Sequence, residues 1–145
     1  MNTNTKLSLM DEVLMRASEQ LGDITPHVMA VYYRSHPEAL AHFERLAFGK
    51  RAQLEGIMVE NSVYCLMKWL EERSEVEILL SGSLIHHEET LKLPPDLYMD
   101  FIDATAAVVS ATIPKECASQ HAVLYEVCGE LRSIVDSAAA RRLPA

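Results

Sequence analysis

The sequence predicts an all-α protein that folds as a single domain over residues 1–145. Three observations predict this. Apolar residues recur at three-to-four spacing along most of the chain, and no segment alternates apolar and polar residues as a half-buried strand would. The length of 145 residues suits one hydrophobic core and is short for two. Gly22, Gly49 and most of the prolines fall at the ends of the periodic segments and divide the chain into about seven helices.

The N-terminal part is predicted to hold three helices and a loose corner. Gly22 breaks the first helix, and Thr25-Pro26 is typical of an N-cap followed by proline at the first helical position. His36 precedes Pro37 and is therefore disfavoured in the α region, so the second helix is expected to end there. The predicted segments are Leu7–Ala17, Thr25–Ser35, a short helix over Pro37–Phe43, and the corner Leu46–Gly49.

The C-terminal part is predicted to hold four longer helices. Ser74 separates the first two, and the second leads into a pair of histidines, His86 and His87. Pro94-Pro95 then restarts the chain as a new helix, which Pro114 closes. The predicted helices are Arg51–Glu72, Val76–Ile85, Leu97–Ile113 and Ser119–Ala139, with a frayed tail over Ala140–Ala145.

Composition excludes several classes of function. The net charge of −8 argues against nucleic acid and anionic membranes as partners. No apolar run approaches the roughly 20 residues of a membrane span, and the polar start of the chain lacks the layout of a signal peptide. The three scattered cysteines form no Cys-x-x-Cys pair and favour a reducing, cytoplasmic location. No phosphate-binding loop or Gly-x-Ser-x-Gly motif is present, so the chain is not expected to be an enzyme.

The histidine pair is the strongest candidate for chemistry. His86 and His87 end an apolar helix beside the start of the next one, and a neutral imidazole there could bind a metal or a haem iron. The alternative is a solvated helix end, where a cation is favourable in any case. A helical metal site built from His86, His87, Glu88 and Glu89 is a weaker hypothesis, because no second Glu-x-x-His motif accompanies it.

Three local matches resemble the globin superfamily. The segment from His36-Pro37-Glu38 to Phe43 resembles the bacterial haemoglobin segment that leads to the haem-stacking phenylalanine. His87 is followed by Leu91, Leu93, Pro95 and Tyr98 at the offsets seen after the proximal histidine of vertebrate globins. Leu-Pro-Pro-Asp-Leu-Tyr over residues 93–98 is similar to a segment of globin-coupled sensor domains, in which the histidine lies one residue nearer the prolines.

This resemblance implies a globin-like fold with a pocket large enough for haem b. His87 is then the expected axial ligand of the iron, with His86 as the alternative; the two point about 100° apart on a helix, so only one can face the pocket. Phe43 is expected to stack on the haem, Leu91 and Leu93 to pack under it, and Phe101 to reach it from the next helix.

The distal side of the expected pocket has two alignments. Counting from Phe43 places Gln53 at the distal position, with Ile57 one turn later, whereas counting back from His87 places Met58 there, with Ser62 one turn later. Gln53 could donate an N–H to bound dioxygen, and Met58 could not. The distal tyrosine of many bacterial globins corresponds to Met29, which weakens an expectation of tight oxygen binding.

Two functions follow from the resemblance. The first is a haem protein that binds dioxygen, nitric oxide or carbon monoxide as a carrier, scavenger or sensor, with an external reductase if it turns over. The second is a haem-free or haem-regulated sensor module that dimerises and signals to a partner protein. The C-terminal helix face with Val123, Val127 and Leu131 could form that dimer or could equally belong to the core.

Overall fold

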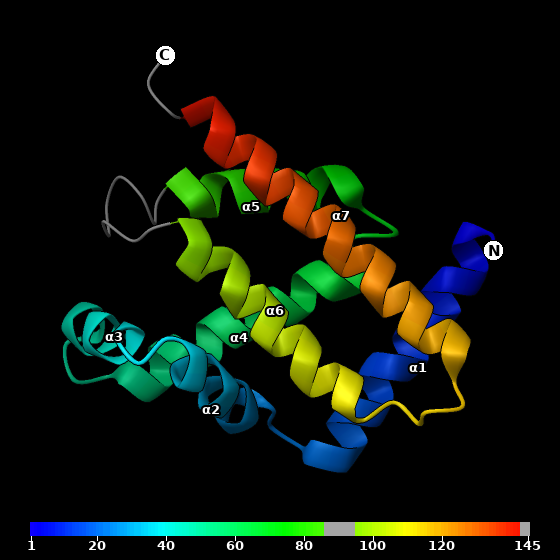
Figure 1. The fold of residues 1–145 in the computed structure, drawn as a ribbon, viewed down its shortest axis with the longest axis horizontal. Coiled ribbons are helices and arrows are strands. Elements are labelled where there is room, and N and C mark those ends of the chain that lie inside the picture. The colour runs from blue at the N-terminus through cyan, green and yellow to red at the C-terminus, as the bar shows by residue number, and fades with distance from the viewer. Residues whose placement is uncertain (86–94, 143–145) are drawn as a thin grey trace.

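The computed structural model describes residues 1–85 and 95–142 and confirms the all-α prediction. No strand occurs in this part of the chain. The helices are α1 Thr3–Leu21, α2 Thr25–Ser35, α3 Ala39–Ala47, α4 Arg51–Lys68, α5 Arg73–Ile85, α6 Pro95–Ala111 and α7 Ala118–Arg142 (Figure 1).

The first two helices begin and end at identifiable caps. Asn2 caps α1, because its side-chain oxygen accepts a hydrogen bond from the Thr5 N–H at 2.8 Å. Gly22 ends α1 with a φ of 66°, a conformation that suits glycine. Thr25 was expected to cap α2, and this is wrong: Thr25 is already helical, and its N–H is bound by the Asp23 carboxylate at 3.0 Å.

Two predicted boundaries in the middle of the chain also differ. The short helix starts at Ala39, not at Pro37, because residues 37 and 38 form a turn in which the His36 carbonyl accepts from the Ala39 N–H. It continues through the expected corner to Ala47 and ends at Phe48, which has a left-handed φ of 49° and is 91% exposed.

The long central helix α4 is shorter than predicted. It ends at Lys68 instead of Glu72, and the Lys68 carbonyl accepts from the N–H groups of both Glu71 and Glu72 in the turn that follows. The next helix starts at Arg73. Apolar periodicity continues through this turn because Trp69 and Leu70 pack on the core, so the pattern could not reveal the break.

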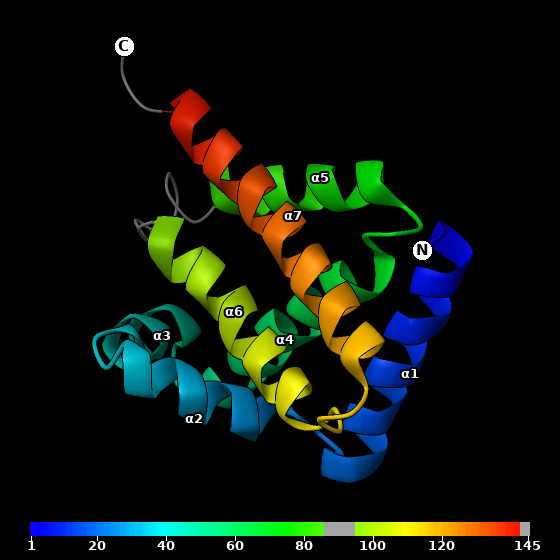
Figure 2. The same ribbon diagram turned by 45° about the vertical axis from the view of Figure 1, so that its right-hand side comes forward.

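Helices that are distant in sequence pack on one another. Helix α1 lies against α7, α2 against α6, and α6 beside α7 (Figure 2). Helix α5 packs on the C-terminal part of α7, and α4 contacts every other helix. The chain therefore forms crossed helices around a central one rather than an up-and-down bundle. Within the described residues, no helix is long and apolar enough to cross a membrane.

The buried side chains form two clusters. The aliphatic core joins α1, α4, α5, α6 and α7 and contains Trp69 and the three α7 residues that could have formed a dimer face, each at most 1% exposed: Val123, Val127 and Leu131. The aromatic cluster joins α2, α3, α4 and α6 and comprises Val28, Met29, Tyr32, Ala39, Phe43, Val59, Phe101, Ala104 and Val108.

Candidate functional site

A small cavity of about 40 Å³ lies where α4, α5 and α6 meet. It adjoins both clusters, because Cys65 and Ile102 belong to the aliphatic core and Phe101 to the aromatic cluster. Helix α5 contributes Ser83, which precedes the predicted axial histidines by three and four residues. The described lining residues are Met58, Asn61, Ser62, Cys65, Ser83, Tyr98, Phe101 and Ile102.

The two distal alignments fall on different faces of α4. Met58 and Ser62 line the cavity together with Phe101. Gln53 and Ile57 instead line a separate groove between α4 and the α1–α2 corner, and Ile57 is 50% exposed there. The structure thus brings Met58 and Phe101 together and places Gln53 and Ile57 elsewhere, because residues five apart on a helix differ by about 140°.

Phe43 lies in the aromatic cluster beside Phe101. Both side chains are 2% exposed, and their ring centroids are 6.3 Å apart. Tyr32 contacts both rings, with an edge-to-face approach of 4.9 Å to Phe101 and a tilted contact of 6.0 Å to Phe43. Such geometries are favourable for aromatic pairs. Rings from α2, α3 and α6 therefore pack into one buried cluster, and Phe101 is the ring of the three that also lines the cavity.

The hydroxyl groups close to this surface are all engaged. The Tyr32 hydroxyl donates to the Leu97 carbonyl at 2.9 Å, and the Tyr33 hydroxyl donates to Glu55 at 2.5 Å. Ser62 donates to the Met58 carbonyl at 3.1 Å within its own helix. Burial raises the pKa of both tyrosines, and the bond to Glu55 raises that of Tyr33 further. Both phenols are therefore neutral donors whose protons are already used.

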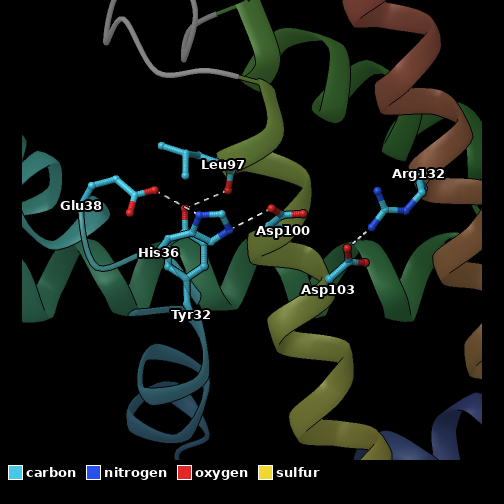
Figure 3. A network of polar contacts seen from close by, with 7 residues as sticks. All are labelled: Tyr32, His36, Glu38, Leu97, Asp100, Asp103 and Arg132. Atoms are coloured by element: carbon cyan, nitrogen blue, oxygen red, sulfur yellow. Dashed lines mark hydrogen bonds and ion pairs between the residues drawn. The ribbon is translucent and has the colours of Figure 1, made fainter. Parts of the chain in front are cut away.

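His36 bridges α2, α3 and α6 at the edge of the aromatic cluster. Its Nε2 lies 2.8 Å from Asp100 and its Nδ1 lies 3.2 Å from Glu38 (Figure 3). The Glu38 pKa is lowered, first by its own backbone N–H and then by His36. An ion pair between Asp103 and Arg132 ties α6 to α7. These contacts hold the first three turns of α6.

Two titratable groups line the cavity in the neutral form. Burial raises the pKa of the Cys65 thiol to about 11. Burial also raises the pKa of Tyr98 to about 12, against a smaller lowering effect of its hydrogen bond with Ser83. At neutral pH the described walls of the cavity therefore carry no charge, which suits an apolar ligand.

Four of the predicted site residues lie outside the described residues. They are the candidate axial ligands His86 and His87 and the expected haem-packing residues Leu91 and Leu93. The alternative metal site with Glu88 and Glu89 falls in the same segment. Among the residues that the structure does describe, no group of three or more His, Cys, Asp or Glu side chains is placed to hold a metal ion.

Sequence reasoning missed the polar contacts that shape the site. Glu55 is only 9% exposed, and its partners are the partly buried Tyr33 and, at 3.4 Å, Arg51 one turn earlier on α4. The pairing of His36 with Asp100 carried no local signal, because it joins residues 64 positions apart.

The chain gives no match to a protein-family model, to a curated protein or to a solved structure. The likeness to globins therefore stays a prediction from local motifs, and the proposals below rest on the residues themselves.

Proposed function

We propose that this protein is a globin-like domain that binds haem b and, through its iron, a diatomic gas. The observation that carries the proposal is the cavity between α4, α5 and α6. Met58 and Ser62 face it from α4, Phe101 faces it from α6, and the chain leaves it at Ser83 toward His86 and His87.

The helix packing supports a globin-like arrangement. Seven helices occur in the described residues, and pairs that are distant in sequence, such as α2 with α6 and α1 with α7, pack on one another, as expected for a non-bundle helical fold of the globin kind. Phe43, on the short helix α3, lies at the edge of the same region, as the resemblance implies for a haem-stacking residue.

The described residues have the chemistry expected for one side of a haem site. A porphyrin needs apolar and aromatic surroundings, which Phe43, Phe101 and Met58 provide, and its iron needs an axial imidazole, for which His87, or alternatively His86, is proposed. The space among the described walls is about 40 Å³, close to the volume of one water molecule. These walls are therefore proposed as one side of the site, with Leu91 and Leu93 on the other.

The distal wall favours carbon monoxide and nitric oxide over dioxygen. Haem iron supplies an open axial position for a gas, and bound dioxygen gains most from a nearby hydrogen-bond donor. The hydroxyls of Tyr32, Tyr33 and Ser62 are engaged elsewhere, and Met58 has no donor. Asn61 also lines the cavity and carries an amide, but this residue is exposed to solvent and is therefore not a buried donor beside a ligand.

An absorption spectrum tests the proposal. The purified protein is titrated with haemin, reduced with dithionite, and exposed to carbon monoxide. A sharp Soret band that shifts with carbon monoxide, and that His87→Ala abolishes and His86→Ala retains, is the expected result. Failure of the folded helical protein to take up haem stoichiometrically would contradict the proposal.

Two further variants test whether the cavity face of α4, and not its groove face, controls gas affinity. Met58→Gln places an amide donor in the cavity and is expected to raise dioxygen affinity relative to carbon monoxide by about tenfold, a free-energy difference of about 1.4 kcal/mol. Gln53→Leu, on the other face, is the matched control and is expected to change neither affinity.

The close aromatic packing supports a second candidate, a haem-free signalling module. If Phe43, Phe101 and Tyr32 remain in mutual contact, they fill the region that a haem would enter. In that case the protein would act by self-association. The aliphatic core uses the Val127 face of α7, so a dimer through the C-terminal helices would use the opposite face, where Tyr125 is 84% exposed. Sedimentation of the haem-free protein tests this alternative.

A further inference from the structure

A groove that the proposed haem site does not use runs along α4, on the face that carries Gln53 and Ile57. The groove has a volume of about 700 Å³, and its other wall is formed by α1 and the α1–α2 corner. Leu14, Ala17 and Ser18 come from α1, and Val59 and Val109 lie at its base. The α4 residues that line it, apart from Val59, are Ala52, Gln53, Gly56, Ile57, Glu60, Val63, Tyr64 and Met67.

The α4 residues that line the groove form a stripe, and the composition of this stripe is unusual for the solvent-facing side of a helix. From Ala52 to Met67 it runs for about 22 Å, and Glu60 is its only charged residue. Ile57 is 50% exposed and Met67 is 38% exposed. A surface helix normally presents charged and polar residues to water, so this face has the composition of one that is covered by another element.

The charged residues in the lining of the groove are acidic. Its described lining contains the carboxylates Asp23 and Glu60 and no lysine, arginine or histidine. At its Tyr64 end, the Tyr64 hydroxyl donates to Glu75 of α5 at 3.2 Å. Glu75 in turn raises the pKa of Glu72, first by a hydrogen bond and then by its charge, against a lowering effect of Lys68.

We propose that this groove binds a basic amphipathic helix of a partner protein. The length of the stripe matches a helix of about four turns, and its apolar residues at three-to-four spacing offer the seam into which such a helix packs. The acidic rim selects lysine and arginine on the flanks of that helix. A second acidic copy of this chain, with its net charge of −8, does not complement the rim.

Gly56 gives a direct way to close the groove. It lies in the middle of the stripe, and a Cβ added there meets no atom within 4 Å, so a side chain at this position projects into open space. A phenylalanine at position 56 therefore fills the groove without disturbing the helix, whose stability a non-glycine residue favours. Gly129 on α7 is equally open and lies away from the groove, which makes Gly129→Phe the matched control.

The test measures binding of a fluorescently labelled designed peptide of about 15 residues, with leucines on one face and lysines on its flanks. Gly56→Phe is expected to weaken binding by about tenfold or more, and Gly129→Phe to leave it unchanged. Glu60→Gln is expected to weaken binding about threefold and to reduce its salt dependence. Glu116→Gln, at an exposed position outside the groove, is the charge control.

Two results would overturn the proposal. One is equal binding of the wild type and Gly56→Phe, both with unaltered helical circular dichroism. The other is a groove occupied by a second copy, seen as a concentration-dependent dimer that Gly56→Phe dissociates. A peptide with glutamates in place of lysines must bind at least tenfold more weakly; otherwise the acidic rim has no role. None of these measurements involves haem, so they are independent of the proposed function.

Discussion

The two buried clusters of this protein are built from different side chains. The aliphatic core contains valine, leucine, isoleucine and methionine around one aromatic ring, that of Trp69. The aromatic cluster contains Tyr32, Phe43 and Phe101, and its tyrosines keep their hydroxyls bonded to specific partners. Branched aliphatic side chains pack at high density without a directional preference, whereas aromatic rings prefer edge-to-face and offset contacts of defined geometry.

This difference suggests a division of roles. The aliphatic core packs α1, α5, α6 and α7 against α4. Polar contacts lie at its edge: Trp69 donates a hydrogen bond to Glu130, and Glu130 also forms an ion pair with Arg73 at 2.9 Å. The Arg73 guanidinium lies 4.6 Å from the centre of the indole ring. We expect the aliphatic core to determine global stability and the aromatic cluster to determine what the domain binds.

The largest effect is expected at Trp69. Trp69→Ala should lower the free energy of unfolding by about 3–5 kcal/mol, because it leaves a cavity in the aliphatic core and removes a partner of Glu130. Urea unfolding followed by circular dichroism measures this. Trp69→Phe, which keeps a ring but removes the N–H donor, should cost about 1–2 kcal/mol. Equal losses for the two variants would show that packing contributes little at this position.

The next effect is alkaline destabilisation. The pKa of Tyr98 is raised from about 10 to about 12 by burial, so the folded state favours the neutral phenol. Its contribution is complete below pH 10 and is lost as the pH rises through about 12, on the order of 2–3 kcal/mol. Tyrosinate absorbance and helicity, recorded together across this range, measure it. Tyr98→Phe should reduce the slope of stability against pH; an unchanged slope would assign the effect to Tyr32 and Tyr33.

A smaller effect is expected at Phe43. Phe43→Leu should cost about 1.5 kcal/mol, because it removes the ring contacts with Tyr32, Tyr33 and Phe101 and keeps most of the apolar volume. Under the proposed function it should also speed haem loss to an acceptor globin. Leu80→Met in the aliphatic core, of similar cost, is the control that should not alter haem retention. Equal haem loss from both variants would contradict the division of roles.

The smallest effect is expected at the Tyr32 hydroxyl. Tyr32→Phe keeps the ring contacts and removes only the 2.9 Å bond to the Leu97 carbonyl, for about 1 kcal/mol. Because this bond ties α2 to the first turn of α6, hydrogen exchange should increase locally at α6. A uniform increase over all helices would mean that the bond acts on global stability instead.

Local residue patterns predicted most of the fold. Apolar spacing and the prolines at positions 26, 37 and 114 placed the helices, since each depends only on neighbouring residues. The misplaced ends, predicted at Pro37, Phe43 and Glu72, lie where tertiary contacts or turn hydrogen bonds override the pattern. For the site, Phe43 and Phe101 were each expected to contact a haem, which stays a prediction; the structure shows that their ring centroids lie 6.3 Å apart.

The sequence by itself determined the all-α class and the order of the helices. Only the tertiary structure decided which face of α4 lines the inter-helix cavity, because the rotation of a helix depends on its neighbours, and Met58 and Gln53 are both compatible with the local pattern. It also decided that Val123, Val127 and Leu131 belong to the core, and it revealed the acidic groove beside Gly56. These features join residues far apart in the chain, and no local pattern encodes such pairings.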